Sequence, residues 1–134
     1  MINPINFKAI QLWWIQFPIQ LKLITKIRFF SAFGAGGVIY LTSLIFNNIG
    51  FSATDIGLGF SFSAIIGTLT RVITGYYLNS NKDIVSPIKI SCTLSIFASI
   101  FLITANEPIY YLIGQSFIGA AAGIYWPSAE LAVP

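Results

Sequence analysis

The chain has 134 residues, of which 56% are hydrophobic and only 8% are charged. Soluble domains usually carry about 25% charged residues, so this composition favours an integral membrane protein. A single cysteine and the lack of histidine exclude a disulfide framework and a His/Cys metal site. The net charge of +3 is too small and too unevenly placed to indicate nucleic-acid binding.

Residues 1–27 predict a cytoplasmic, interfacial amphipathic helix rather than a signal peptide or a membrane span. They hold no contiguous apolar core leading to a small-residue cleavage site, and Pro18 interrupts the apolar run. Apolar residues recur at intervals of three and four, with lysines on roughly the opposite side, as in helices that lie in the interface. Because Leu12, Ile15 and Ile19 fall on the basic side, a merely apolar leader remains an alternative. The apolar residues of the pattern are Ile10, Trp13, Trp14, Phe17, Leu21 and Ile24, and the lysines are Lys8, Lys22 and Lys26.

Residues 28–134 contain four segments that are long and apolar enough to cross a bilayer as helices. The hydrocarbon core is about 30 Å thick, so a span needs roughly 20 mostly apolar residues. Short pieces rich in Asn, Gly, Ser and Pro join the segments and make consecutive helices antiparallel neighbours. The sequence therefore predicts an all-α membrane protein, with helices at approximately 29–48, 56–78, 84–105 and 109–131.

The basic residues predict the orientation of these spans. They gather ahead of the first span and around the second connection. The charged residues of the first and third connections, in contrast, are all acidic. Under the positive-inside rule, the N-terminus and residues 79–83 then lie in the cytoplasm. We expect the membrane to be the inner (plasma) membrane of a bacterium. The basic residues are Lys8, Lys22, Lys26, Arg28, Lys82 and Lys89, and the acidic ones are Asp55 and Glu107.

Arg71 is the only charge well inside a predicted span. It lies about 10 Å below the cytoplasmic boundary, since a helix rises about 1.5 Å per residue. Isolated charges at that depth usually face a water-filled pathway or a partner helix, which favours a functional position. A residue that snorkels to the interface is the alternative.

Small residues recur at multiples of four along the second predicted helix, at Gly59, Ser63, Gly67 and Gly75, with Arg71 in the same series. Small residues at this spacing allow another helix to approach closely. The third helix has no glycine, and we expect it to face lipid more than the others. Plain helix packing explains most of these glycines. The first helix carries Gly34, Gly36 and Gly37, and the fourth carries Gly119 and Gly123.

The first and fourth helices share a pattern. Residues 31–41, SAFGAGGVIYL, align without gaps on residues 116–126, SFIGAAAGIYW. Because these helices cross the membrane in opposite directions, a repeat three helices apart has inverted topology, which is characteristic of secondary transporters. The matched pairs are Ser31/Ser116, Gly34/Gly119, Ala35/Ala120, Ile39/Ile124 and Tyr40/Tyr125.

Over residues 28–134 the chain resembles the amino-terminal part of a major facilitator superfamily transporter. In that family the loop between helices 2 and 3 reads G-x-x-x-D-R-x-G-R-R. Here Gly75 holds the first glycine position and Asn79 stands in the place of the aspartate, but the basic pair is lost. The family's helix 4 carries an arginine before a glycine-rich run. This chain has Gln115 in the arginine's place, keeps Gly119 and Gly123, and closes with GIYWPSAEL.

The resemblance implies part of a secondary transporter that moves a small solute by alternating access, with the lipid bilayer and the remaining helices of a larger transporter as partners. The lost loop charges imply a weaker latch at Gly75 and Asn79, and Gln115 puts proton coupling through helix 4 in doubt. No cofactor is implied, and we do not expect these 134 residues to transport alone. The residues expected to contact solute are Arg71, Gln115, Tyr40, Asn47 and Tyr125.

Two alternatives remain open. The first is a self-contained four-helix protein that works as an oligomer, like small multidrug pumps, although the glutamate those pumps carry in helix 1 is missing here. The second is a non-transporting remnant of a larger protein. An enzyme is least favoured, since the sequence offers no Ser/His/Asp set and no phosphate-binding G-x-x-x-x-G-K-[ST] loop.

Overall fold

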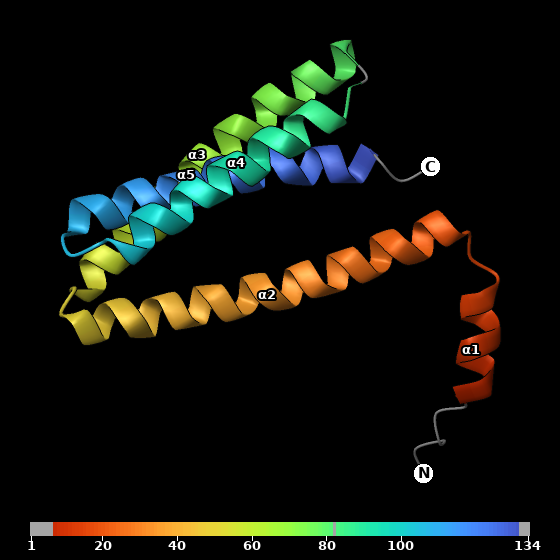
Figure 1. Ribbon diagram of the computed structural model, residues 1–134, viewed down its shortest axis with the longest axis horizontal. Coiled ribbons are helices and arrows are strands. Elements are labelled where there is room, and N and C mark those ends of the chain that lie inside the picture. The colour runs from red at the N-terminus through yellow and green to blue at the C-terminus, as the bar shows by residue number, and fades with distance from the viewer. Residues whose placement is uncertain (1–6, 82, 132–134) are drawn as a thin grey trace.

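The computed structural model describes residues 7–81 and 83–131, and this part of the chain is helical with no strand (Figure 1). The all-α prediction is therefore confirmed. The helices are α1 (Phe7–Ile15), α2 (Ile19–Ile49), α3 (Ala53–Ser80), α4 (Val85–Ile103) and α5 (Pro108–Leu131).

The first helix break lies at Pro18, earlier in the chain than residues 27 and 28, where we divided the sequence. Proline lacks an amide hydrogen and disfavours helix in the residue before it, so α1 ends ahead of it, whereas a helix readily begins just after it. Residues 19–27 are thus the first turns of α2 and not part of a separate interfacial helix. α1 lies at a steep angle to α2 (Figure 1). Its position at a membrane interface stays a prediction.

The connection between α2 and α3 is fixed by two capping motifs. Gly50 ends α2 in the left-handed region, at a φ of 104°, which glycine adopts without a steric penalty. The amides of Gly50 and Phe51 donate to the carbonyls of Asn47 and Phe46, which is a Schellman motif. Ser52 then begins α3 through a capping box with Asp55. Three residues therefore suffice to reverse the chain.

The connection between α3 and α4 is fixed by a carboxylate. Asp83 Oδ1 accepts hydrogen bonds from the amides of Val85 (3.0 Å) and Ser86 (3.3 Å), two of the donors that a helix start leaves unsatisfied. The following helix, α5, begins at Pro108, where the missing amide hydrogen costs nothing.

α5 is the centre of the bundle. It packs along both α3 and α4, whereas α2 lies apart from these three helices over most of its length (Figure 1). α2 and α5 are antiparallel: Arg28 near the start of α2 meets Glu130 at the end of α5, and Phe46 near the end of α2 meets Tyr111 at the start of α5. The opposite directions predicted for these two helices are confirmed.

Three of the described helices are long and apolar enough to cross a membrane: α2 from Leu21 onward, α3 and α4. This supports an integral membrane protein. α5 does not meet the same criterion, because tyrosines, glycines and Gln115 dilute its apolar residues. Its sides face other helices, so it needs less apolar surface than a helix surrounded by lipid.

A cluster of aromatic residues joins α2, α3 and α5 where the first connection reverses the chain. The Tyr111 ring, fully buried, lies 4.5 Å from the Phe46 ring and 5.8 Å from the Phe51 ring, centroid to centroid. The Tyr111 hydroxyl donates to the Ile56 carbonyl (3.3 Å). Ala105 completes this aromatic cluster. The end of α2 is therefore held firmly, unlike its middle.

Candidate functional site

α3 and α5 cross at backbone contact through their glycines. A Cβ atom added at Gly119 would overlap the Ser63 carbonyl, and one added at Gly123 would overlap Thr70 and the Gly67 carbonyl. At Gly59 the same atom would enter the Tyr111 ring. The packing predicted from the four-residue spacing is present over this part of the stripe.

Between α4 and α5, serine and alanine take the place of glycine and allow the two helices to pack closely. The buried Ser91 hydroxyl donates to the Ala121 carbonyl across the interface (2.9 Å), and Ala98 is buried two turns further along the same face. Our expectation that the glycine-free helix would be the most lipid-facing was wrong, because α4 packs extensively on α5 whereas α2 does not. Side chains as small as serine and alanine allow close approach as well, so a helix without glycine can still pack tightly.

A cavity of about 350 Å³ lies between α2 and the α4–α5 pair, which we call the α2 cavity. Its size falls within the roughly 300–1,000 Å³ typical of small-molecule sites. It has no charged residue in its lining, and its polar groups are serine and tyrosine hydroxyls. Such a lining suits an uncharged solute. The lining residues are Val38, Ser91, Ser95, Ala98, Ser99, Leu102, Ile118, Ala121, Ala122 and Tyr125.

α2 also meets α5 directly at two places, an ion pair near the start of α2 and the aromatic cluster near its end. An Arg28 guanidinium nitrogen lies 3.6 Å from a Glu130 carboxylate oxygen. The same guanidinium lies 5.9 Å from the centroid of the Trp126 ring, within reach of a cation–π interaction. We call this group of three residues the Arg28 latch.

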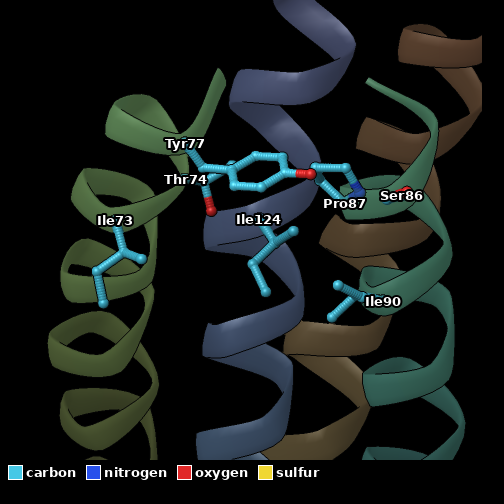
Figure 2. Close-up of a pocket in the computed structure, with 7 residues that line it drawn as sticks. All are labelled: Ile73, Thr74, Tyr77, Ser86, Pro87, Ile90 and Ile124. Atoms are coloured by element: carbon cyan, nitrogen blue, oxygen red, sulfur yellow. The ribbon is translucent and has the colours of Figure 1, made fainter. Parts of the chain in front are cut away.

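A second, smaller pocket of about 230 Å³ lies among α3, α4 and α5 (Figure 2). Figure 2 shows the Tyr77 ring extending from α3 toward Pro87 of α4, above Ile124 of α5. The lining is mainly apolar, with hydroxyls from Thr74, Tyr77 and Ser86. Its volume is below the range typical of ligand sites.

The structure does not bring the five expected solute-contacting residues into one site. Tyr125 lines the α2 cavity, whereas Arg71 is exposed and lines a different depression beside the α3–α5 crossing. Gln115 is buried in α5, 2% exposed, and lines neither of these spaces. Tyr40 and Asn47 are exposed on α2. These roles stay predictions.

The four residues assigned to the family motifs fall into two groups. Gly119 and Gly123 lie at the backbone contact between α3 and α5. Gly75 has open space where a Cβ would stand, and it lines an exposed depression together with Asn79. Lys82, one of the basic residues at the second connection, lies outside the described residues.

The sequence reasoning missed the Arg28 latch and the serine contact of α4. Glu130 is one of only four carboxylates in the chain and follows a tryptophan by one helical turn, so it could have been paired with the single arginine ahead of the first span. Ser91, Ser95 and Ser99 repeat every four residues, which marks one face of α4. Among the described residues, no cluster of three or more metal-ligating side chains occurs.

Comparison of the chain with models of known protein families, with curated proteins and with solved structures gives no match in any of the three.

Proposed function

We propose that the chain is the amino-terminal part of a secondary transporter, which moves a small solute across the membrane by alternating access. The observation that carries this proposal is the antiparallel relation between α2 and α5, the two helices that share the pattern of residues 31–41 and 116–126. Related helices of opposite direction are the elements from which inverted-repeat transporters are built.

Four membrane spans are part of the proposal, with α5 as the fourth. Under the positive-inside rule, the Arg28 latch and the α3–α4 connection face the cytoplasm, and the aromatic cluster lies near the opposite surface. A cysteine-free variant, Cys92→Ser, tests this directly. With a membrane-impermeant maleimide added outside intact cells, we expect labelling of Asn106→Cys and none of Ser80→Cys; the reverse pattern contradicts the orientation.

Two polar residues are proposed to contact solute. Arg71 would supply a charge beside the α3–α5 crossing, and Gln115 would supply amide hydrogen bonds in α5 once neighbouring helices move. Tyr40, Asn47 and Tyr125 would add hydrogen bonds or stacking from α2 and α5. Solute movement is measured with the complete gene product in proteoliposomes, incubated with a defined mixture of amino acids, sugars and nucleosides and analysed by mass spectrometry.

The expected result is accumulation of at least one compound of the mixture, reduced in Arg71→Ala and Gln115→Ala at equal protein content. Thr93→Ala is the control, because it changes an exposed polar residue of α4 that lies outside the depression lined by Arg71. Wild-type accumulation in both variants removes their proposed roles. Absence of accumulation of every compound, relative to protein-free vesicles, counts against transport of these solute classes.

A further inference from the structure

We propose that α2 is a movable arm that widens and narrows the α2 cavity, and that the Arg28 latch holds this arm against α5. The arm has three parts: an anchored end at the aromatic cluster, a pliable middle at Gly34, Gly36 and Gly37, and a releasable end at Arg28. The inference concerns the motion of one helix and does not require that the chain transports a solute.

The anchored end is defined by burial and capping. Phe46 is 4% exposed and packs on Tyr111, and the Schellman motif at Gly50 and the capping box at Ser52 fix the backbone that follows. Movement of α2 at this end would separate buried rings. The arm therefore moves relative to a fixed base.

The pliable middle is defined by missing contacts. At Gly34, Gly36 and Gly37, no atom of another helix lies within 4 Å of the position that a Cβ would occupy. Glycine inside a helix weakens it, because the unfolded backbone has more freedom to lose. Three glycines within four residues, without a neighbouring helix to support them, make this the segment where α2 bends most easily.

The Arg28–Glu130 ion pair holds α2 against α5, but it is weak enough to break reversibly. Its ion pair is partly exposed, with 43% of the Arg28 side chain and 62% of the Glu130 side chain accessible, so water and salt screen it. The Arg28 Nε atom is buried without a hydrogen-bond partner among the described residues, which opposes the closed position. The ion pair thus favours the latched position and the unpartnered Nε opposes it, so we expect both positions of the arm to be populated.

Spin-label distances test the arm in the Cys92→Ser variant reconstituted in liposomes. One label pair, at Leu23→Cys and Leu131→Cys, reports on the latched end. A second pair, at Ile49→Cys and Ile109→Cys, reports on the anchored end. All four side chains are at least half exposed, so labels are tolerated. Distance distributions are measured by double electron–electron resonance.

Removing the latch charge should shift the first pair toward longer distances. Since partly exposed ion pairs contribute little, Glu130→Gln is expected to raise the ratio of long to short distances about two- to fivefold. The exchanged pair, Arg28→Glu with Glu130→Arg, should restore the short distance. Glu107→Gln, which removes the carboxylate ahead of α5 at the opposite end, should change neither label pair.

Two further measurements keep the proposal falsifiable. Sodium chloride at 1 M should lengthen the distance of the first pair in the wild-type latch, because the screening length falls to about 3 Å. Replacing Gly34, Gly36 and Gly37 by alanine in the Glu130→Gln background should reduce the long-distance population. Identical distributions with and without the Glu130 charge, or a second pair that moves with the first, would overturn the arm.

Discussion

α2 and α5 are both long helices with the same short pattern of glycine, alanine and tyrosine, yet they have opposite surroundings. Along α5 the glycines lie against the backbone of α3 or the side chains of α4, and Gly114, Gly119 and Gly123 are all buried. Along α2 the glycines face open space, and the helix meets its neighbours mainly near its two ends. The helix with a continuous stretch apolar enough to cross a membrane is thus the less enclosed of the two.

This difference shows that a glycine pattern describes a capacity for close packing and not the packing itself. α5 is enclosed because α3 offers a complementary set, Ser63, Gly67 and Thr70, at the crossing height. No described helix offers such a set to the glycines of α2. The energetic consequence is that replacing a glycine by alanine should change stability with opposite sign in the two helices.

The largest effect is expected at the aromatic cluster, where buried rings of α2 and α5 pack together. Tyr111→Ala removes a fully buried ring, and truncating a buried aromatic residue typically costs about 3–5 kcal/mol. The free energy of unfolding is measured by titrating sodium dodecyl sulfate into detergent micelles. Tyr110→Ala is the control: its side chain is 44% exposed, so it should cost clearly less. Equal losses would show that the cluster contributes no special packing.

A pair of identical glycine substitutions tests the comparison itself. Gly119→Ala should destabilise by about 1–3 kcal/mol, since the added methyl group forces α3 and α5 apart at the Ser63 carbonyl. Gly36→Ala should stabilise by about 0.5–1 kcal/mol, because the space around it is open and alanine favours the helix. Unfolding in the same detergent titration measures both. A destabilising Gly36→Ala would mean that α2 is as closely packed as α5.

A smaller effect is expected from the serine contact on the other side of α5. Ser91→Ala deletes the hydrogen bond to the Ala121 carbonyl, and such interhelical bonds contribute about 0.6 kcal/mol on average in membrane bundles. Ser99→Ala is matched in chemistry, but its hydroxyl donates only within α4, to the Ser95 carbonyl. The difference between the two losses, from the same titration, isolates the α4–α5 contact. If Ser99→Ala costs as much, the interhelical bond adds nothing.

Local sequence signals predicted the helices and their connections well. The connecting segment NIGFSATD contains Gly50 and Ser52, the residues that cap α2 and α3. The helices on either side were predicted from the length of their apolar segments alone. The error at α2 arose because residues 19–27 carry enough charge to resemble an interfacial segment, although nothing after Pro18 interrupts the helix. Proline gave the correct boundary, and the distribution of lysines gave a false one.

The arrangement of the helices was harder to predict than their existence. Small residues indicated that the first, second and fourth spans pack closely. This is confirmed for α3 and α5, but it was wrong for α2, whose glycines face open space. Residue spacing could not tell that α4 would pack through serine, or that Arg71 would lie on the exposed side of its helix. Which face of a helix meets which neighbour depends on all the helices together, and residue spacing within one helix does not contain that information.

The smallest expected effect is a change in the pKa of Asp83. This residue lies outside α2 and α5, so its pKa serves as a reference that does not depend on how those two helices pack. Hydrogen bonds from the Ser86 hydroxyl and from the Ser86 and Val85 amides, with the charge of Lys89 nearby, hold the pKa of the Asp83 carboxyl below its ordinary value of 3.8. Because the folded pKa is lower than the unfolded one, this contribution to stability is fully present above pH 3.8 and is lost as the pH falls through the folded pKa.

Carbon-13 shifts of the Asp83 carboxyl, followed by nuclear magnetic resonance in micelles, measure that pKa. Ser86→Ala should raise it toward 3.8 by removing the largest favourable contact, whereas Ser99→Ala, on the same helix but distant from the carboxyl, should leave it unchanged. Gly119→Ala should also leave it unchanged if the start of α4 is held by its own cap. A shift in that variant would mean that the cap depends on the position of α5, and the connections could then no longer be treated as local.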